Sequence, residues 1–432
     1  METGRVCQPS RVKERRGSGQ KEAEKPQLKV SDLLRHYAGA YVQKHPSAAV
    51  PQVQSTLAKL SLCRTSALGI RQFKCKSCLA ESMIYNSCGD RHCSECAGSK
   101  RANWLEKTCK LLLPDVDYFQ VVFTLPSELS RLALGNRKPI YDLLFRTSWG
   151  ALRETIEAEQ GYKAAAMMVL HTWNQKLEAH GHVHAVVPSG GPSLRKVGHW
   201  KLCRFKGQET SRHLVDAREL RRNYRERFIE GLRRLHRDGQ LKLTGEFEDL
   251  NDEDEFEKLL EKLASVAWGL NIQPPPTSDC DSQTMLKYLA RYLTGGPISD
   301  RRLVSHDDGT VTFMAREGTT RGGDRKQVPV PLNGVEFVRR WSLHVLPRGY
   351  VKTRRYGGWS NRHCEDYMQL CRDLRNCPAE DDSNEDIDPS EVPEKECAEC
   401  GGSLELIYVE DKPSWSRTMH SPSRPYWYQE SG

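Results

Sequence analysis

The chain has no long apolar run. None of its 432 residues falls in a stretch of about 18 apolar residues, the length that a membrane-spanning helix needs, so we expect no membrane partner. Residues 1–26 are polar, lack the apolar core of a secretory signal and read as a disordered basic arm. A GxxxxGK[ST] loop is also missing, which argues against ATP-driven chemistry of the P-loop type.

Cysteine is abundant, although nothing predicts secretion. Fifteen cysteines in such a chain favour metal binding or buried thiols over a disulfide framework. The net charge of +8 is unevenly distributed, because residues 380–396 are strongly acidic and are interpreted as a linker. Segments 218–237 and 339–356 are basic. For 218–237, a solvated helix face is an equally open interpretation.

The segment 339–356 carries six Lys/Arg residues, no acidic residue, and interleaved aromatic residues. Cations bind phosphates and aromatic rings stack on bases, so this composition favours nucleic acid. The predicted DNA contacts are Arg339, Arg340, Arg348, Lys352, Arg354 and Arg355.

Residue patterns predict mixed α and β structure. Residues 164–175 and 182–188 are predicted to be two strands of one hairpin, and 282–294 a helix closed by glycines. Further predicted strands are 118–126, 266–276 and 310–316, and predicted helical segments are 27–70, 216–237 and 251–266.

The motif HGHVHAVVPSGG, residues 180–191, contains three histidines in five positions. Side chains alternate along a strand, so His182 and His184 project from one face and Val183 from the other. Two imidazoles about two strand rises apart can reach one metal ion. A histidine-rich strand edge without a ligand is the other interpretation that these residues leave open.

Two CxxC motifs lie near the N-terminus. Cys75 and Cys78 are separated by fourteen residues from Cys93 and Cys96, a spacing that predicts one structural Zn²⁺ held by four thiolates. Cys88 and His92 lie between the pairs and could replace a ligand or help to hold a second ion. Cys63 is expected to be a buried thiol, with a ligand role as the lesser alternative.

The motif CAECGG, residues 397–402, is a single CxxC near the C-terminus. Cys364, Cys371 and Cys377 are potential partners, but none forms a second CxxC. Whether Cys397 and Cys400 bind a second zinc stays open at this point.

Tyr288 and Tyr292 lie at i and i+4 of the predicted helix 282–294 and therefore share a face. Two tyrosines half buried against a sheet would show the same spacing. Beside a metal ion, however, a phenol with a pKa of about 10 becomes a competent nucleophile.

These motifs together resemble those of the two-tyrosine HUH transposases of rolling-circle bacterial insertion sequences, distant relatives of the Helitron transposases. HUH denotes histidine, hydrophobic residue, histidine, here His182, Val183 and His184. The resemblance covers about residues 30–375. It rests on the order of the cysteine-rich module, VVFTLPSEL, HTWNQ, HGHVHAVVPSGG, YLARYLTGGPISDRRL and LHVLPRGYVKTRRYGGWSNRH.

The resemblance implies an α+β fold with a ferredoxin-like HUH nuclease core. His182 and His184 would hold catalytic Mg²⁺ or Mn²⁺, with Gln175 as our candidate third ligand and Glu178 and His180 behind it. Tyr288 or Tyr292 would attack single-stranded DNA and form a 5′-phosphotyrosine. Such a protein acts on transposon ends and target DNA in the bacterial cytoplasm, at the nucleoid.

The expected domain order starts with the basic arm and a helical, zinc-binding, DNA-binding domain at 27–110. The nuclease follows at 115–320 with a helical insertion at 200–265, then the DNA-contacting part at 330–376, and an acidic linker with a CxxC element and tail at 377–432. A rolling-circle replication initiator or relaxase would share the chemistry. A non-catalytic, zinc-dependent DNA-binding regulator is an alternative of another class.

Overall fold

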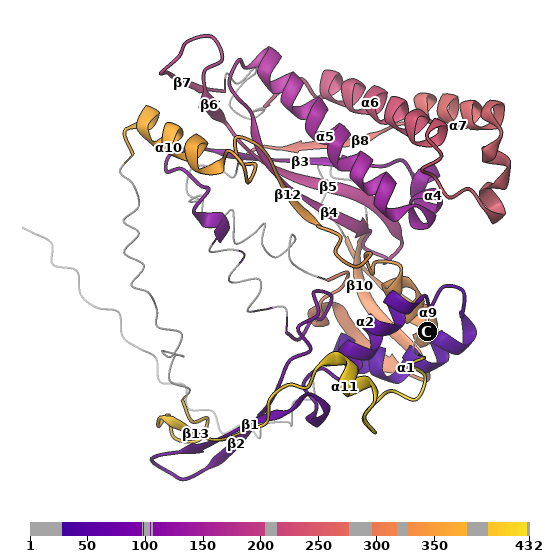
Figure 1. Cartoon of the computed structure of the whole chain (residues 1–432), viewed down its shortest axis with the longest axis vertical. Coiled ribbons are helices and arrows are strands. Elements are labelled where there is room, and N and C mark those ends of the chain that lie inside the picture. Colours follow the sequence, from indigo (N-terminus) through magenta and orange to yellow (C-terminus); the bar gives the residue numbers. More distant parts are fainter. Residues whose placement is uncertain are drawn as a thin grey trace, which may run out of the picture.

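A computed structural model describes residues 28–96, 98, 104, 107–203, 214–275, 296–317, 326–377 and 396–429. The fold is mixed α+β, and its sheets are antiparallel (Figure 1). Among the described residues, no helix is both long and apolar enough to cross a membrane.

The central sheet has five strands in the order β12-β4-β5-β3-β8. Their apolar and β-branched residues favour extended structure. The strands are β3 (Tyr118–Thr124), β4 (Ala165–Trp173), β5 (Ala179–Pro188), β8 (Gly269–Gln273) and β12 (Thr353–Gly357). The predicted hairpin is confirmed, because β4 pairs with β5 in antiparallel register.

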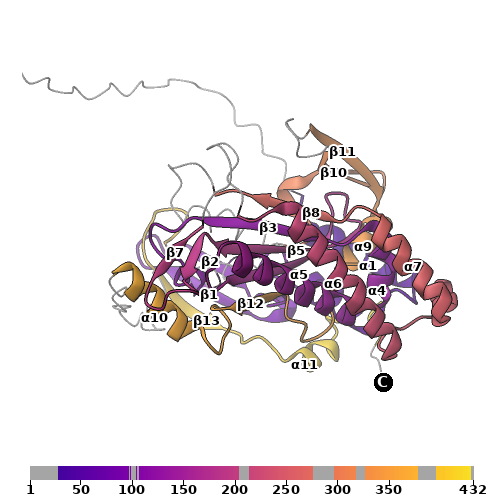
Figure 2. The same cartoon turned by 90° about the horizontal axis from the view of Figure 1, so that it is seen from above.

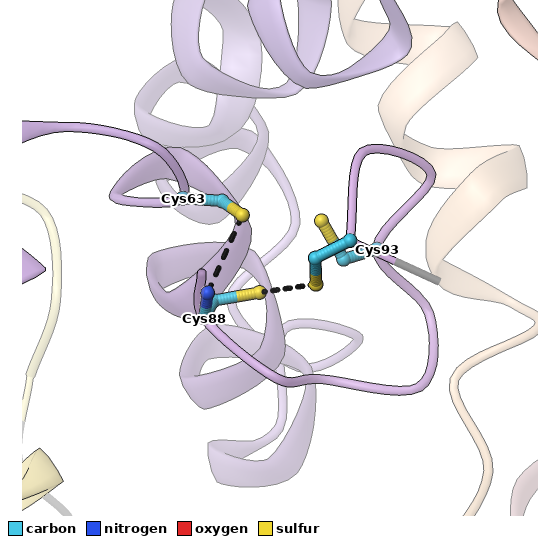
Figure 3. A group of neighbouring side chains, drawn as sticks. Cys63, Cys88 and Cys93 are labelled. Carbon is cyan, nitrogen blue, oxygen red and sulfur yellow. Dashed lines mark hydrogen bonds between the residues drawn. The ribbon is translucent and has the colours of Figure 1, made fainter. Parts of the chain in front are cut away.

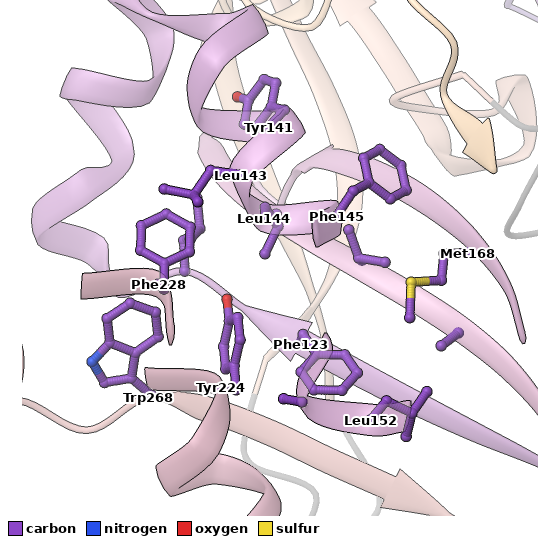
Figure 4. Close-up of a cluster of buried hydrophobic side chains, with 14 of the residues drawn as sticks. Phe123, Tyr141, Leu143, Leu144, Phe145, Leu152, Met168, Tyr224, Phe228 and Trp268 are labelled. Carbon is purple, nitrogen blue, oxygen red and sulfur yellow. The ribbon is translucent and has the colours of Figure 1, made fainter. Parts of the chain in front are cut away.

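Helices cover one face of this sheet: α4 (Ser130–Gly135), α5 (Arg137–Glu159), α6 (Ala217–Arg237) and α7 (Glu253–Ser265). Their apolar sides and alternate residues of β3, β4 and β5 form one core. Figure 4 shows Phe123 of the sheet beside Tyr224 of α6, with Phe228 and Trp268 on the other side of Tyr224. This packing leaves the opposite face of the sheet for other partners.

The opposite face is covered at one end by α10 (Cys364–Arg375). Tyr118, Met167 and Val186 of the sheet pack there with Trp359 and Tyr367. The short strands β6 (Gly190–Pro192) and β7 (Trp200–Leu202) follow β5 near this end.

A second core joins the N-terminal helices to a later part of the chain. It contains α1 (Val30–Lys44), α2 (Pro51–Ser61), α9 (Gly334–Ser342) and the sheet of β9 (Leu303–Asp307), β10 (Thr310–Glu317) and β11 (Lys326–Asn333). Pro329 and Pro331 lie on β11, an edge strand, where a missing N–H is tolerated.

A three-stranded sheet brings together an N-terminal and a C-terminal segment of the chain. Strand β13 (Leu404–Val409) pairs with β1 (Ile70–Cys75), which pairs with β2 (Glu81–Tyr85). Helix α11 (Trp415–Met419) follows β13 and lies near α1 and α2 (Figures 1 and 2). Short 3₁₀ segments are η1 (Ser66–Leu68), η2 (Ser127–Leu129), η3 (Gly245–Asn251) and η4 (Asp300–Arg302).

Gly357, at the end of β12, tests how closely this edge strand packs against β4 and α5. Its φ is +60°, and a Cβ there would overlap the carbonyl oxygen of Ala164 and the ring of Trp149. Gly349 has a φ of +74° in open space. Gly349→Ala should therefore cost about 1 kcal/mol of unfolding free energy from backbone strain alone. Gly357→Ala should cost about 3 kcal/mol or more, because strain and overlap add.

Urea denaturation of the two variants checks this expectation. An equal loss of stability in both variants would contradict the close approach of β12 to β4.

Candidate functional site

Three histidines meet on the face of the central sheet that α5 and α6 do not cover. His182 and His184 lie on β5, and His171 on β4 is paired directly with His182. One ligand nitrogen from each ring can be chosen so that all lie within 4.8 Å of one another. The His171 ring centroid is 5.3 Å from that of His182 and 4.6 Å from that of His184. The three side chains can therefore ligate one ion.

Hydrogen bonds orient two of these rings. Nδ1–H of His182 donates to the carbonyl oxygen of His180 at 2.8 Å, which leaves Nε2 as the ligand atom. Nδ1 of His184 lies 2.7 Å from the side-chain amide of Gln120 on β3. The atom that faces Nδ1 is the amide nitrogen Nε2; with the Gln120 amide turned over, its oxygen accepts from Nδ1–H and Nε2 of His184 is likewise left for the ion.

Burial sets the protonation state of these histidines. It lowers the pKa of His184 to about 4. Burial, and then the nearby positive charge of His184, lowers the pKa of His182 well below 6.5. At pH 7 both imidazoles are therefore neutral, the form that binds metal.

Gln175, expected as the third ligand, is exposed in the turn after β4, and its carbonyl oxygen accepts a hydrogen bond from Arg302. His171 lies beside the pair instead, because the β4–β5 register places it opposite His182. Glu178 is also exposed and lies 3.5 Å from the Arg340 guanidinium. The sequence signal that could have identified His171 is its alternation with Trp173 along β4.

Cys63, Cys88, Cys93 and Cys96 form one buried cluster. Figure 3 shows the sulfurs of Cys63, Cys88 and Cys93 converging from the end of α2 and the loop that follows β2. The Cys88 and Cys96 sulfurs are 3.6 Å apart, and the Cys88 backbone N–H donates to the Cys63 sulfur at 3.4 Å. This arrangement fits a tetrahedral Zn²⁺ site.

A second cluster contains Cys75, Cys78, Cys397 and Cys400. The expected set of Cys75, Cys78, Cys93 and Cys96 is therefore wrong in its pairing. The reason is the β1–β2 hairpin, which places Cys75 and Cys78 at its tip and Cys88–Cys96 beyond its other end, roughly 15 Å away along the strands.

His92 does not join either cluster. Its Nδ1 is 2.8 Å from the Asp90 carboxylate, while Nε2 is buried with no hydrogen-bond partner among the described residues. Cys63, expected mainly as a buried thiol, takes the position beside Cys88.

Tyr288 and Tyr292 lie outside the described residues, as does the helix predicted at 282–294. The described segment that follows them is anchored beside the histidine hairpin. Ile298 is buried in the core that also contains Leu177 of the β4–β5 turn. Arg302 donates to the carbonyl oxygens of Gln175 and of Met314, the latter at 2.8 Å.

Comparison with known proteins gives consistent matches. A family described as "Transposase zinc-binding domain" matches residues 33–125, and one described as "Putative transposase" matches residues 165–366. A putative transposase (y4qJ) of Sinorhizobium fredii is 36% identical over 348 residues, which are 80% of this chain and 83% of that protein. The transposase for insertion sequence element IS801 of Pseudomonas savastanoi pv. phaseolicola is 26% identical over 316 residues, 72% of each chain. No solved structure matches the chain.

The chain belongs to the IS91/IS801 family of Y2 transposases. The zinc-binding match covers the N-terminal cysteines, and the transposase match covers β4, β5, β12 and the positions of both tyrosines. Both matched ranges end before Cys397. As a transposase of an insertion sequence, the protein acts on DNA.

The basic segment 339–356 of this transposase has side chains on both faces of the central sheet. Arg354 lies over the Phe145 ring of α5, 4.3 Å from its centroid, and forms an ion pair with Asp142. Arg355 pairs with Met167, whose side chain packs on the histidine face. Arg355, rather than Arg354, therefore lies on the same face of the sheet as the histidines.

The other basic side chains differ in exposure and pairing. Arg339 and Arg340 both contact Glu336, at 2.6 and 2.8 Å. Arg348 is exposed, and the Lys352 ammonium lies 5.4 Å from the centroid of Trp173.

The low pKa of His184 predicts a pH effect on the metal-free histidine site. The unfolded chain protonates this imidazole near pH 6.5, but the fold does so only near pH 4. The folded state therefore loses stability as the pH falls from 6.5 to 4, by about 2 kcal/mol at pH 4.5.

A His184→Asn variant should show a smaller drop in melting temperature between pH 7 and pH 4.5 than the parent. His199→Asn, at an exposed position, is the matched control. An unchanged drop in His184→Asn would show that this imidazole is not buried in its neutral form.

Proposed function

We propose that this transposase nicks and joins single-stranded DNA by HUH-type chemistry, with a tyrosine as nucleophile. The observation that carries the proposal is the convergence of His171, His182 and His184 on the face of the central sheet opposite α5 and α6. Three imidazoles converging on one point, two of them held neutral by burial, are suited to a divalent ion and have no evident purpose in a protein that only binds DNA.

The sheet order supports a ferredoxin-like HUH core. The histidine strand β5 is central, flanked by β4 and β3, and the helices α5 and α6 lie on the reverse face. An antiparallel sheet of this kind presents its second face to a substrate while the first face holds the core.

The donor set fits a catalytic divalent ion. Nitrogen ligands favour a transition ion such as Mn²⁺ over Mg²⁺, which prefers oxygen and near-ideal octahedral geometry. When bound, the ion would polarise the scissile phosphate and favour the developing charge. The chain's own contribution is to hold three rings in fixed orientation through the His180 carbonyl, the Gln120 amide and the β4–β5 pairing.

Tyr288 and Tyr292 are the proposed nucleophiles, carried from the family's motif YLARY. The phenolic oxygen of one loses its proton and attacks phosphorus, forming a P–O bond to tyrosine. The bond between phosphorus and the 3′ oxygen breaks, and this oxygen takes up a proton and leaves as a 3′-OH. One phosphodiester replaces another, so no ATP is required. The second tyrosine can accept the next strand.

The position of the chain after the tyrosines supports this role. Tyr292 is four residues before Gly296, a separation that an extended chain covers in at most about 14 Å. Ile298 and Arg302 then fasten the chain to the β4–β5 turn, which leads directly into the histidine strands.

The same reasoning gives the proposed division of labour. Residues 27–110 recognise DNA through the zinc-binding domain, 115–320 carry the nuclease, and 330–376 contribute DNA contacts at the bacterial nucleoid. A replication initiator or relaxase would share the chemistry, but the transposase relatives and the zinc-binding domain favour transposition.

The chemistry predicts a covalent protein–DNA adduct with Mn²⁺ and a single-stranded transposon end. Tyr288→Phe with Tyr292→Phe should abolish the adduct, and His182→Ala with His184→Ala should lower cleavage at least 100-fold. His171→Ala should lower cleavage and raise the Mn²⁺ concentration needed, because one of three ligands is lost.

His180→Ala is the matched control, since His180 contributes its backbone carbonyl to His182 and lies outside the three-histidine cluster. The adducted peptide is identified by mass spectrometry. An adduct on another residue, or robust cleavage without His182 and His184, would refute the proposed chemistry.

Arg355 should contact the DNA backbone beside the histidine face. Arg355→Ala is expected to weaken binding of single-stranded DNA and to reduce the slope of log K against log salt by about 0.7 for one lost phosphate contact. The control Arg234→Ala removes the same charge from α6, on the covered side of the sheet. Equal slopes for Arg355→Ala and the parent would exclude this contact.

A further inference from the structure

The second cysteine cluster is built from segments that are 319 to 325 positions apart in the chain. The Cys75 and Cys400 sulfurs are 3.5 Å apart, and those of Cys78 and Cys397 are 3.7 Å apart. Four sulfurs at about 2.3 Å from a tetrahedral Zn²⁺ are separated by about 3.8 Å. The observed separations are thus those of a zinc site, and they exceed the disulfide bond length of about 2.05 Å.

The two CxxC motifs of this cluster adopt matching turns. The residue after each second cysteine has positive φ, +63° at Leu79 and +71° at Gly401. Each donates its N–H to the carbonyl oxygen of the first cysteine, at 3.1 and 2.8 Å. Such tight turns let two sulfurs of one CxxC face a single ion.

Backbone amides also point at the sulfurs. The Ser77 N–H donates to the Cys75 sulfur at 3.4 Å, and the Gly402 N–H donates to the Cys400 sulfur at 3.4 Å. Hydrogen bonds of this kind favour the thiolate, the form that binds zinc.

The backbone brings the two motifs together independently of the sulfurs. Strand β13 pairs with β1, and the Lys76 N–H donates to the Ser403 carbonyl oxygen at 3.0 Å. A Cβ on Gly402 would lie only 3.1 Å from the Cys75 sulfur, so the absence of a side chain permits this approach.

The chain after β13 then follows the first cysteine cluster and the N-terminal helices. Lys412 donates to the Cys88 carbonyl oxygen at 2.6 Å. The Lys59 ammonium of α2 lies 5.1 Å from the centroid of Trp415, and Trp427 is buried in the core of α1 and α2. The C-terminal segment is therefore packed against the first cysteine cluster, α1 and α2.

We propose that Cys75, Cys78, Cys397 and Cys400 bind a second structural Zn²⁺, which makes residues 396–429 an integral part of the N-terminal zinc-binding domain. The matched zinc-binding range, 33–125, contains only half of this site. The metal closes a loop that includes the entire nuclease sheet, so residues 75–78 and 397–400 are held in one small domain. This inference is independent of the proposed nicking chemistry.

The test is the thiolate-to-metal charge-transfer absorption of the full-length protein reconstituted with Co²⁺, which reports cysteine sites and not the histidine site. Cys397→Ser with Cys400→Ser should lose half of this absorption, and zinc analysis should show one ion fewer per chain. Cys75→Ser with Cys78→Ser should give the same loss. The matched control, Cys364→Ser with Cys377→Ser, changes two cysteines outside both clusters and should retain the full signal.

Limited trypsin digestion supplies a second readout. Cleavage at Arg417 and Arg424 should be at least several-fold faster in the Cys397/Cys400 variant than in the control, because the segment is no longer held at the three-stranded sheet. The proposal is overturned if the Cys397/Cys400 variant keeps the parent's metal content, or if the parent contains disulfides between these cysteines. Nicking activity does not enter either measurement.

Discussion

The antiparallel register of β4 and β5 is the constraint on which the rest of the histidine site depends. It pairs His171 with His182 and Val169 with His184, so three imidazoles meet on one face. A slip of one residue would turn the histidines of β5 toward Phe123 and Leu144, where α5 and α6 fill the core. The core formed with α5 and α6 on the other face therefore determines the register, and the register brings the three histidines together.

Local patterns predicted much of this architecture because they act over a few residues. The strands at 118–126 and 164–175 and the hairpin into HGHVHAVV follow from β-branched runs and alternation, and the structure confirms them. The third histidine was missed because its position depends on the pairing register, and that register shifts between His171 and Trp173. The alternation of side chains along one strand does not determine which residues it faces on the neighbouring strand.

The cysteines show a second limit of sequence reasoning. Two CxxC motifs fourteen residues apart predicted a single four-cysteine site, since close spacing usually means a common ion. The β1–β2 hairpin separates them instead, and Cys75 and Cys78 find partners at the other end of the chain. Likewise, composition could not tell Arg354, ion-paired over α5, from Arg355 on the histidine face, because adjacent residues of a strand face opposite ways.

Arg91 is one of the residues that join the zinc-binding domain to the chain around the nuclease sheet. Arg91, in the loop between Cys88 and Cys93, donates to the carbonyl oxygens of Tyr350 at 2.5 Å and of Pro347 at 3.0 Å. These carbonyls belong to the loop that leads into β12, the edge strand with Arg355. A guanidinium that satisfies several backbone acceptors holds such a loop in one conformation. The Cys63 cluster fixes Arg91, Arg91 fixes the approach to β12, and β12 carries a basic side chain to the histidine face. The first cysteine cluster and the edge strand β12 are therefore parts of one continuous structure.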